Sequence, residues 1–497
     1  MKKIALVIIA LICIAGSGAY AKTTLYRIRF GYYPDKIRAV FDFDGAFTYQ
    51  TEEFRDKIRI YLRDIDASPG ISNYVELNDL VVRYFEVEKY DEEHLRVTVP
   101  LGEPIHYNIF YLNDPPRLVI DFDREYLNIV SGGTVADGIE FLRVRKGTVD
   151  GRVNASVLKI DLDQVEVEPV LAKRKKPNLV ESLVGFFTPW RGREAREEHF
   201  ALAPVSEIVM ESGAAAGVNG TYFAFTGSPL GALMVNQELI SAPIHERTAF
   251  FLDEKNRPYI DNIYVSCYLQ LASGVRYRIT GINQGRGGND LIMYTPVWGR
   301  STGTNERGLE LVVVGSRVEK INLSNSEIPQ DGYVLSASGP GVETLAESVR
   351  IGSRIDTRLR IIPYTTSPQK IIHLVSGGPR LLRQGRPYVS KHAEKFKMDI
   401  AKGRAARTAV GITKDKRLLL VTVDGPPKES PRRQREVSIG LTLEELSELM
   451  RVLGATEAMN LDGGSSSTMV IGNKVVNRPT AGTERRVNNA IVLRSKD

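Results

Sequence analysis

Apolar and polar residues alternate in several short runs within the first 125 positions of the chain. The clearest runs cover residues 25–30 and 37–43, where apolar side chains recur at about every second position. A period of two predicts strands with one buried face. Turn residues separate these runs from three further candidates at residues 81–87, 95–99 and 118–122. We therefore predict a small β-sandwich over residues 22–125.

A helical pattern near the C-terminus contrasts with these strands. Thr442 and Glu445 have the spacing of a capping box, which predicts that a helix begins just after Thr442. Gly454 is the expected end of this helix. Its predicted buried face consists of Leu443, Leu446, Met450 and Leu453. Strands and helices mix from about residue 205 onward, so we predict an α+β fold: an N-terminal β-sandwich followed by a larger mixed α/β domain at 205–497.

Part of this larger domain repeats. Segments 206–219 and 447–460 share Ser, Glu, Gly, Ala and Asn at a constant offset of 241 positions. The Arg-Thr-Ala triplet at 247–249 recurs at 407–409. These matches predict a duplicated unit, with the two copies facing each other across a pseudo-twofold axis and a site between them.

The first 21 residues have the features of a secretory signal peptide. Lys2 and Lys3 precede an apolar stretch at residues 4–14, and Ala19 and Ala21 form an A-x-A cleavage site. The apolar stretch is shorter than the roughly 20 residues that span a bilayer. A retained anchor is the alternative. We expect export to the periplasm, cell wall or extracellular space, with no transmembrane segment after cleavage.

Charge and cysteine content narrow the range of partners. The formal net charge is +6, and it falls to +4 when Lys2 and Lys3 are removed. This mild excess favours an anionic wall or extracellular glycan as partner and does not require nucleic acid. Cleavage leaves Cys267 as the single cysteine, so stability must come from buried cores.

Residues 126–204 are predicted to connect the two domains, with a basic insertion at 173–193 that is either a solvated loop or a polyanion-binding arm.

The strongest chemical signal lies at residues 458–470, where an apolar strand leads into Asp462. Gly463 and Gly464 follow, and glycines permit a tight turn and close approach of a ligand. Their amides are predicted to form an anion-binding concavity beside the hydroxyls of Ser465 and Ser466. Asp462 is therefore a candidate base, nucleophile or metal ligand. An ordinary Asp-Gly turn is the alternative.

Other polar residues also follow predicted strands. Asp424 comes directly after an apolar run at 418–423, and two carboxylates are the usual minimum for cleaving a glycosidic bond. Asn219 suits sugar hydroxyls because it both donates and accepts, and Tyr222 offers a ring for stacking. Arg407 offers a bidentate donor for phosphate. The predicted substrate-binding set is Asn219, Tyr222, Gly377, Gly378, Arg407, Thr408, Asn460, Gly463, Gly464, Ser465, Ser466, Arg486 and Asn488, with Asp462 and Asp424 as the catalytic pair.

Six blocks in order resemble the phosphodiester glycosidase family: GVNGTYF at 217–223, SGGPRLL at 376–382, RTAVGIT at 407–413, LLLVTVDG at 418–425, AMNLDGGSSSTM at 458–469 and RRVNNAIVL at 485–493. The resemblance implies hydrolysis of a glycosyl-1-phosphodiester between the anomeric carbon and the phosphate oxygen. Arg407, Arg486 and the glycine amides would hold the phosphate. Asp462 or Asp424 would activate water or attack the anomeric carbon, and the sequence does not assign the two roles.

The N-terminal region has a resemblance of its own. Residues 36–43 together with 116–122 resemble the AMIN domain of bacterial envelope proteins, which implies binding to wall glycans. The alternative is any other small β-sandwich.

Two other functions fit parts of the sequence. A phosphodiesterase that cuts the P–O bond would usually recruit paired metals, but the six histidines are scattered without ligand spacing. A non-catalytic glycan-binding protein would not need both acids. No cofactor is required, and a divalent cation held by Asp462, Asp424 and Asn460 is an open alternative. The sugar, its anomeric configuration and the oligomeric state are not predicted.

Overall fold

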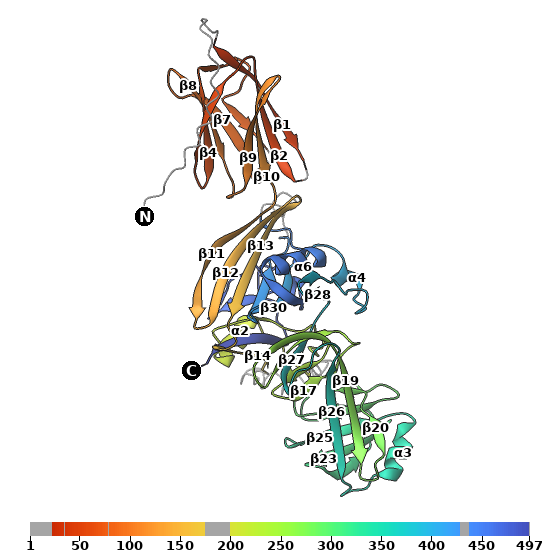
Figure 1. Cartoon of the computed structure of the whole chain (residues 1–497). Coiled ribbons are helices and arrows are strands. Elements are labelled where there is room, and N and C mark those ends of the chain that lie inside the picture. The colour runs from red at the N-terminus through yellow and green to blue at the C-terminus, as the bar shows by residue number, and fades with distance from the viewer. Residues whose placement is uncertain (1–21, 34, 78, 174–198, 428–436, 497) are drawn as a thin grey trace, which may run out of the picture. The chain divides into compact units, whose positions relative to one another are not determined.

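A computed structural model of the chain describes residues 22–33, 35–77, 79–173, 199–427 and 437–496 (Figure 1). The predicted signal peptide and most of the basic insertion lie outside these residues. The chain divides into two compact units, one made of Met1–Val130, Val144–Asn154 and Glu429–Ser438, the other of Ser131–Arg143, Ala155–Lys428 and Ile439–Asp497. No helix in the described part of the chain is both long and apolar enough to cross a bilayer.

The first unit contains a β-sandwich of two five-stranded sheets around a core of Phe41, Phe85 and Phe122. One sheet has the order β5-β1-β2-β10-β9 and comprises β1 (Thr23–Tyr32), β2 (Lys36–Phe43), β5 (Ile65–Ala67), β9 (Tyr107–Asn113) and β10 (Pro116–Asp123). The other has the order β3-β4-β8-β7-β6 and comprises β3 (Thr48–Glu53), β4 (Lys57–Arg63), β6 (Tyr74–Glu76), β7 (Tyr84–Lys89) and β8 (His94–Pro100). The two segments of the AMIN-like motif, β2 and β10, pair antiparallel.

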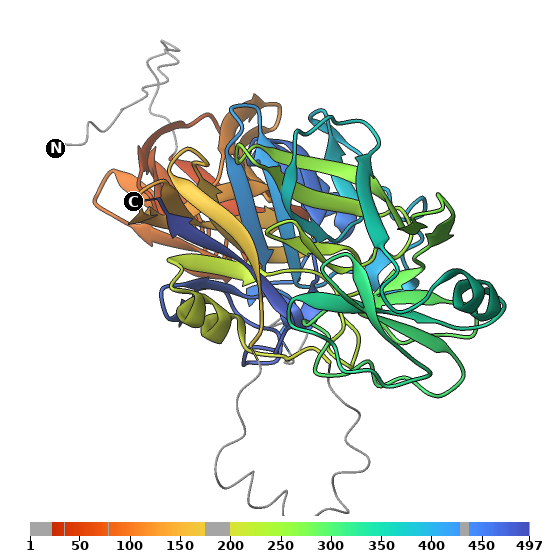
Figure 2. The ribbon, with the colours of Figure 1, turned by 90° about the horizontal axis from the view of Figure 1, so that it is seen from below.

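The second unit is built on four sheets, which are mostly antiparallel. The largest runs β11-β12-β13-β31-β30-β32-β28-β29, and β11, β12 and β13 each contribute residues to both units. Its strands are β11 (Tyr126–Ala136), β12 (Ile139–Thr148), β13 (Gly151–Ile160), β28 (Arg380–Arg383), β29 (Arg386–Pro387), β30 (Arg407–Thr413), β31 (Leu418–Val423) and β32 (Ala455–Asn460). A five-stranded sheet runs β14-β35-β15-β33-β34, with β14 (Val165–Leu171), β15 (Ala216–Asn219), β33 (Met469–Ile471), β34 (Lys474–Val475) and β35 (Asn489–Ser495). The last strand of the chain, β35, thus lies between β14 and β15 (Figure 2).

The two remaining sheets come mainly from the middle of the chain. One runs β17-β16-β27-β18-β19-β20 with β26 also paired to β19, and comprises β16 (Leu233–Val235), β17 (Glu238–Ser241), β18 (Thr248–Asp253), β19 (Pro258–Leu271), β20 (Arg276–Arg278), β26 (Ile355–Pro363) and β27 (Ile371–Ser376). The other runs β21-β22-β25-β23-β24, with β21 (Gly281–Ile282), β22 (Leu291–Tyr294), β23 (Leu309–Val314), β24 (Arg317–Asn322) and β25 (Gly332–Ala337). The described helices include α2 (Val205–Ser212), α3 (Gly341–Ser348), α4 (Met398–Ala401) and α6 (Leu443–Val452). The predicted mixed fold with an N-terminal sandwich is confirmed.

The predicted capping box is present at the start of α6. Thr442 Oγ1 accepts a hydrogen bond from the Glu445 amide at 3.2 Å, and Glu445 accepts one from the Thr442 amide at 2.9 Å. Gly454, whose backbone is left-handed (φ 96°), then leads into β32. The buried face of α6 thereby fixes the strand that carries the strongest chemical signal.

The predicted helix–glycine–strand pattern is present twice, and the end of a third strand, β27, has the same local geometry. In α2–β15 and in α6–β32, a helix leads through a left-handed glycine to a strand that ends in Asn219 or Asn460. These asparagines lie opposite Ala490 and Ala409 in their neighbouring strands, and Ser376 at the end of β27 lies opposite Ala249 in the same way.

The equivalence extends to the next residue of each strand. Gly220, Leu461 and Gly377 each donate their amide to the carbonyl of the residue before the paired alanine: Asn489 at 3.2 Å, Thr408 at 2.8 Å and Thr248 at 3.1 Å, respectively. Three strand pairs, β15–β35, β32–β30 and β27–β18, therefore end in the same local geometry.

Candidate functional site

The three equivalent strand ends meet and hydrogen bond to one another. Asn219 donates its side-chain amide to the Asp462 carbonyl at 2.6 Å, and the Asp462 amide donates to the Gly220 carbonyl at 3.2 Å. The Gly378 amide donates to the Asn460 carbonyl at 2.7 Å. Asn219 and Asp462, which are 243 residues apart in the sequence, thus meet in one polar junction.

Tyr222 and Asn460 occupy the middle of this junction. The Tyr222 hydroxyl donates to the Gly378 carbonyl at 3.0 Å and accepts from Asn460 Nδ2 at 2.8 Å. Burial raises the pKa of Tyr222, and the nearby Asp462 carboxylate raises it further, so the phenol stays protonated. Asn460 Oδ1 and the Ser467 hydroxyl are buried without a hydrogen-bond partner among the described residues. Buried polar atoms of this kind are uncommon and need an explanation such as a ligand or a water.

Asn219 and Thr408 also belong to this junction, as predicted from their positions. Thr408 Oγ1 donates to Asn219 Oδ1 at 2.8 Å, and the same oxygen accepts the Thr468 amide at 3.1 Å. These bonds hold the strand ends together, and direct binding of a substrate by Asn219 and Thr408 stays a prediction.

Asp462 lies at the exposed rim of the junction. Burial raises the pKa of its carboxyl to about 6, against the opposing effects of the Ser466 hydroxyl, the Arg485 guanidinium and the Gly463 amide. The residue itself is half-buried, so its carboxyl is withdrawn from bulk water without being sealed off. A carboxyl with these properties can exchange a proton near neutral pH.

The amides of Gly463 and Gly464, which were predicted to bind an anion, already donate hydrogen bonds within the protein. The Gly463 amide donates to Asp462 Oδ1 at 2.9 Å and the Gly464 amide to the Ala406 carbonyl at 2.8 Å. Gly377 and Gly378 likewise donate to backbone carbonyls. Close packing explains the glycine at 378, because a Cβ there would collide with the Glu394 carboxylate.

Asp424, the second predicted acid, has a different environment at the same edge of the large sheet. It follows β31 as Asp462 follows β32, with β30 between these strands. Its Oδ1 accepts the Arg478 amide at 2.8 Å, and the residue is buried. Burial raises the pKa of Asp424 to about 6, opposed by Arg478, Arg143 and Asn477. Different groups therefore shift the pKa of Asp424 and the pKa of Asp462.

Arg407 is buried under the glycine turn and is held by three carbonyls. Its guanidinium donates to Leu441 at 3.0 Å, to Ile400 at 3.2 Å and to Gly403 at 3.0 Å. Burial lowers its pKa, while the charges of Tyr222 and Glu444 raise it. Three of the five N–H groups are used in these bonds, which leaves two for another acceptor.

Two predicted residues from the C-terminal block lie elsewhere. Arg486 is exposed and donates to the Leu202 carbonyl, whereas the adjacent Arg485 faces the junction and donates to Ser466 Oγ at 3.2 Å. Asn488 is buried and donates to the Gly227 carbonyl at 3.0 Å. This segment thus brings Arg485, which was not predicted, next to Asp462, and a binding role for Arg486 stays a prediction. Ser465 is half-buried in the turn beside Ser466.

Arg247 and Glu394 join the junction although they were not predicted as site residues. Arg247 lies over the Phe396 ring at 4.0 Å, and its charge reaches Tyr222. Glu394 is buried, accepts the Thr248 amide at 2.9 Å and Thr248 Oγ1 at 2.6 Å, and thereby ties down the strand that pairs with β27. The repeated Arg-Thr-Ala triplet could have identified Arg247, whereas no pattern surrounds Glu394.

A metal site was left open by the sequence. Within the described ranges, no group of three or more His, Cys, Asp and Glu side chains has the geometry to hold a metal ion. Different groups shift the pKa values of Asp462 and Asp424, and the cation site considered for these two acids and Asn460 stays a prediction.

Part of the chain is similar to a known protein family. Residues 307–494 match the family model for phosphodiester glycosidases. The N-acetylglucosamine-1-phosphodiester alpha-N-acetylglucosaminidase of Mus musculus is 27% identical over 164 residues, which are 31% of this chain and 30% of the mouse protein. The chain therefore matches less than a third of the length of this curated relative.

Two solved structures share the fold over nearly the whole chain. A hypothetical protein from Synechocystis has a TM-score of 0.61 at 21% identity, covering 96% of this chain and 81% of its own. A putative exported protein from Burkholderia pseudomallei K96243 has a TM-score of 0.55 at 19% identity, covering 91% of this chain and 97% of its own. At these identities the likeness concerns the fold alone.

Proposed function

We propose that this protein is an exported glycosidase that hydrolyses a sugar-1-phosphodiester bond in an envelope or extracellular glycopolymer. The family match at residues 307–494 supports the reaction class. The observation that carries the proposal is the Asp462 carboxyl, whose pKa is raised by burial to about 6 at the rim of a polar junction with Arg485 beside it.

Positive charge around the junction supports a phosphodiester as the leaving group. The charges of Arg247 and Arg407 lower the pKa of Tyr222, and the charge of Arg485 lowers the pKa of Asp462. Arg407 forms no ion pair with the carboxylates of the described residues, so its charge is available to an anionic substrate. Neutralising a phosphodiester makes it a good leaving group without a strong general acid.

In this proposal, ionised Asp462 acts at the anomeric carbon. It either attacks that carbon or takes a proton from an attacking water, while the C–O bond to the phosphate breaks and the phosphodiester oxygen keeps the electron pair. The products are a free sugar and a phosphomonoester. Asn460 Oδ1 is an acceptor available for a sugar hydroxyl. The two routes differ in the anomer first released, since direct attack gives retention and water activation gives inversion.

The N-terminal β-sandwich is proposed to hold the enzyme beside its glycan, in keeping with the AMIN resemblance. Exposed Tyr32 and Tyr33 lie near the guanidinium groups of Arg124 and Arg38, at 5.9 Å and 5.8 Å from their ring centres. Arg124 and Arg38 are ion-paired with Asp79 and Asp121, so the exposed rings suit the apolar faces of sugars.

The proposal is tested with p-nitrophenyl phosphodiesters of N-acetylglucosamine, glucose, galactose and mannose, linked through the anomeric oxygen, in water enriched in ¹⁸O. Cleavage at the anomeric carbon releases p-nitrophenyl phosphate and places the label in the sugar. Cleavage at phosphorus places the label in the phosphate and would support a phosphodiesterase instead. Absence of turnover with all four sugars, together with retained glycan binding, would support a non-catalytic binding protein.

A further inference from the structure

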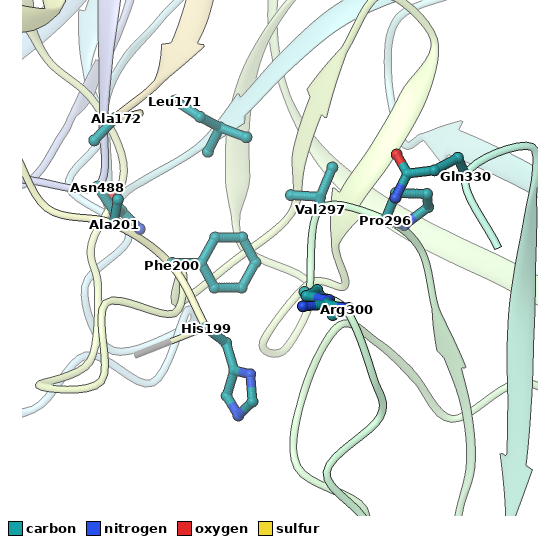
Figure 3. A pocket seen from close by; sticks show the side chains of 11 residues that line it. Leu171, Ala172, His199, Phe200, Ala201, Pro296, Val297, Arg300, Gln330 and Asn488 are labelled. Carbon is teal, nitrogen blue, oxygen red and sulfur yellow. The ribbon is translucent and has the colours of Figure 1, made fainter. Parts of the chain in front are cut away.

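Two neighbouring pockets lie in the second unit, and neither is lined by Asp462, Tyr222 or Asn460. The first, of about 290 Å³, has Arg300, Gln330 and Asn488 in its wall (Figure 3). The second, of about 390 Å³, has Arg286 and Thr304 in its wall. His199 lines both pockets, so they adjoin each other at this side chain.

An aromatic group forms the shared wall. The His199 ring stacks on Trp298 with centroids 3.6 Å apart and an angle of 11° between the planes. Phe200 meets the same indole edge-on at 6.4 Å. The indole is fixed by a hydrogen bond from its Nε1 to the Thr302 carbonyl at 3.2 Å. Rigid aromatic walls of this kind pack against the apolar faces of sugar rings.

A buried carboxylate orients the hydroxyls of the second pocket. Glu310 is fully buried and accepts Thr304 Oγ1 at 2.6 Å and Thr302 Oγ1 at 3.1 Å. Burial alone would raise the pKa of Glu310, but hydrogen bonds from Thr304, Ser326 and Ser336 hold it below its ordinary value, so the carboxylate is ionised and only accepts. Each threonine therefore gives its proton inward. Thr304 Oγ1 also accepts the Asn325 amide at 3.2 Å, so one lone pair of this hydroxyl is left for a donor in the pocket. Sugar hydroxyls are such donors.

An arginine lines each pocket, Arg300 the first and Arg286 the second. Arg286 donates to Ser336 Oγ at 2.7 Å and to Asn305 Oδ1 at 2.9 Å, and Ser336 in turn donates to the ionised Glu310 at 2.8 Å, so the charge of Arg286 is partly offset. Arg300 is exposed, and its guanidinium forms no ion pair with an acid of the described residues. An arginine without an acidic partner favours an anionic group.

We propose that these two pockets form a second carbohydrate-binding site, which takes a sugar bearing an anionic substituent. The sugar ring lies against the His199–Trp298 wall, its hydroxyls donate to Thr302 and Thr304, and its anionic group meets Arg300 and Arg286. This site does not depend on the proposed chemistry at Asp462.

The fluorescence of Trp298 provides the test. The chain has two tryptophans, and replacing Trp190 by Phe leaves Trp298 as the only indole. This protein is titrated with N-acetylglucosamine 1-phosphate, glucuronic acid and neutral N-acetylglucosamine. We expect a saturable change with both anionic sugars and about tenfold weaker binding of the neutral one. Tight binding of only one anionic sugar would identify the substituent as phosphate or carboxylate.

Four variants, each made in the Trp190→Phe protein, test which residues produce the fluorescence change. Thr304→Val should weaken binding about tenfold, whereas Thr304→Ser, which keeps the hydroxyl, should restore it. Arg300→Gln, at an exposed position that folding does not depend on, should abolish the preference for anionic sugars. Asp462→Asn should leave the titration unchanged. The proposal is overturned if no sugar changes the fluorescence, if Arg300→Gln leaves the anionic preference intact, or if Asp462→Asn removes the response.

Discussion

Asp462 and Asp424 follow β32 and β31, two strands of the same sheet with β30 between them, and both have a raised pKa of about 6, yet they occupy different environments. Asp462 is half-buried and faces a serine hydroxyl and the Arg485 guanidinium. Asp424 is buried and binds the backbone amide of Arg478. Burial produces the same shift in both, so a perturbed pKa does not by itself identify a catalytic acid. Access to a substrate and the identity of the neighbouring groups separate them.

The largest difference is expected when each acid is replaced by its amide. Asp462→Asn should lower kcat/KM for a sugar-1-phosphodiester by about 10³-fold or more, because the amide neither ionises nor attacks carbon. Asp424→Asn should change it by less than about tenfold, since the Asn side-chain oxygen can still accept the Arg478 amide. Equal losses in the two variants would show that both carboxylates take part in the reaction.

The next largest difference in kcat/KM is expected between substitutions of the adjacent arginines Arg485 and Arg486. Arg485→Gln removes the cation beside Asp462 and should lower kcat/KM by about 10- to 100-fold. Arg486→Gln is the matched control, because among the described residues its exposed guanidinium donates to the Leu202 carbonyl and to no other group, and its activity should stay within about twofold of the parent. The reverse ranking would mean that the phosphate binds on the Arg486 side.

The pH profile reports on Asp462 directly. Ionised Asp462 is the reactive form, so kcat/KM should fall about tenfold for each pH unit below about 6. Arg485 lowers the pKa of this carboxyl, so Arg485→Gln should move the acid limb to higher pH. An acid limb that stays in place in Arg485→Gln would assign it to another group.

The smallest effect concerns stability. The pKa of Asp424 is raised from 3.8 to about 6 in the folded protein, so its stabilising contribution is fully present below pH 3.8 and is lost as pH rises through 6. A shift of this size is worth about 3 kcal/mol at pH 8. Asp424→Asn should therefore raise Tm by a few degrees at pH 8. At pH 4 the same substitution should leave Tm unchanged or lower it. Thermal melts at the two pH values check this, and a loss of stability at pH 8 would show that the ionised form is preferred in the fold.

Local patterns predicted the local structure well. The capping box at Thr442 and Glu445 was confirmed because both hydrogen bonds form within four residues. The shared helix-glycine-strand pattern correctly marked Asn219 and Asn460 as strand ends, and the structure brings both to one junction. The third equivalent, at Ser376, was not predicted because it shares the backbone geometry with the other two but not their sequence.

The details of the site depend on contacts that sequence does not encode locally. Whether the amides of Gly463 and Gly464 are free is decided by Asp462 and by Ala406 on a neighbouring strand. Arg485 and Arg486 are adjacent in the chain and point to different partners, so composition could not choose between them. Glu394 enters the site from a segment with no regular pattern.

The position of β35 at the centre of its sheet has a consequence for the timing of assembly. This strand pairs with both β14 and β15, and Asn489 at its start accepts the Thr221 amide at 3.2 Å. The ribosome makes residues 489–495 after every other part of the junction. A nascent chain that has not yet reached these positions therefore lacks the strand that pairs with Asn219, and the Gly220 amide lacks its acceptor, the Asn489 carbonyl.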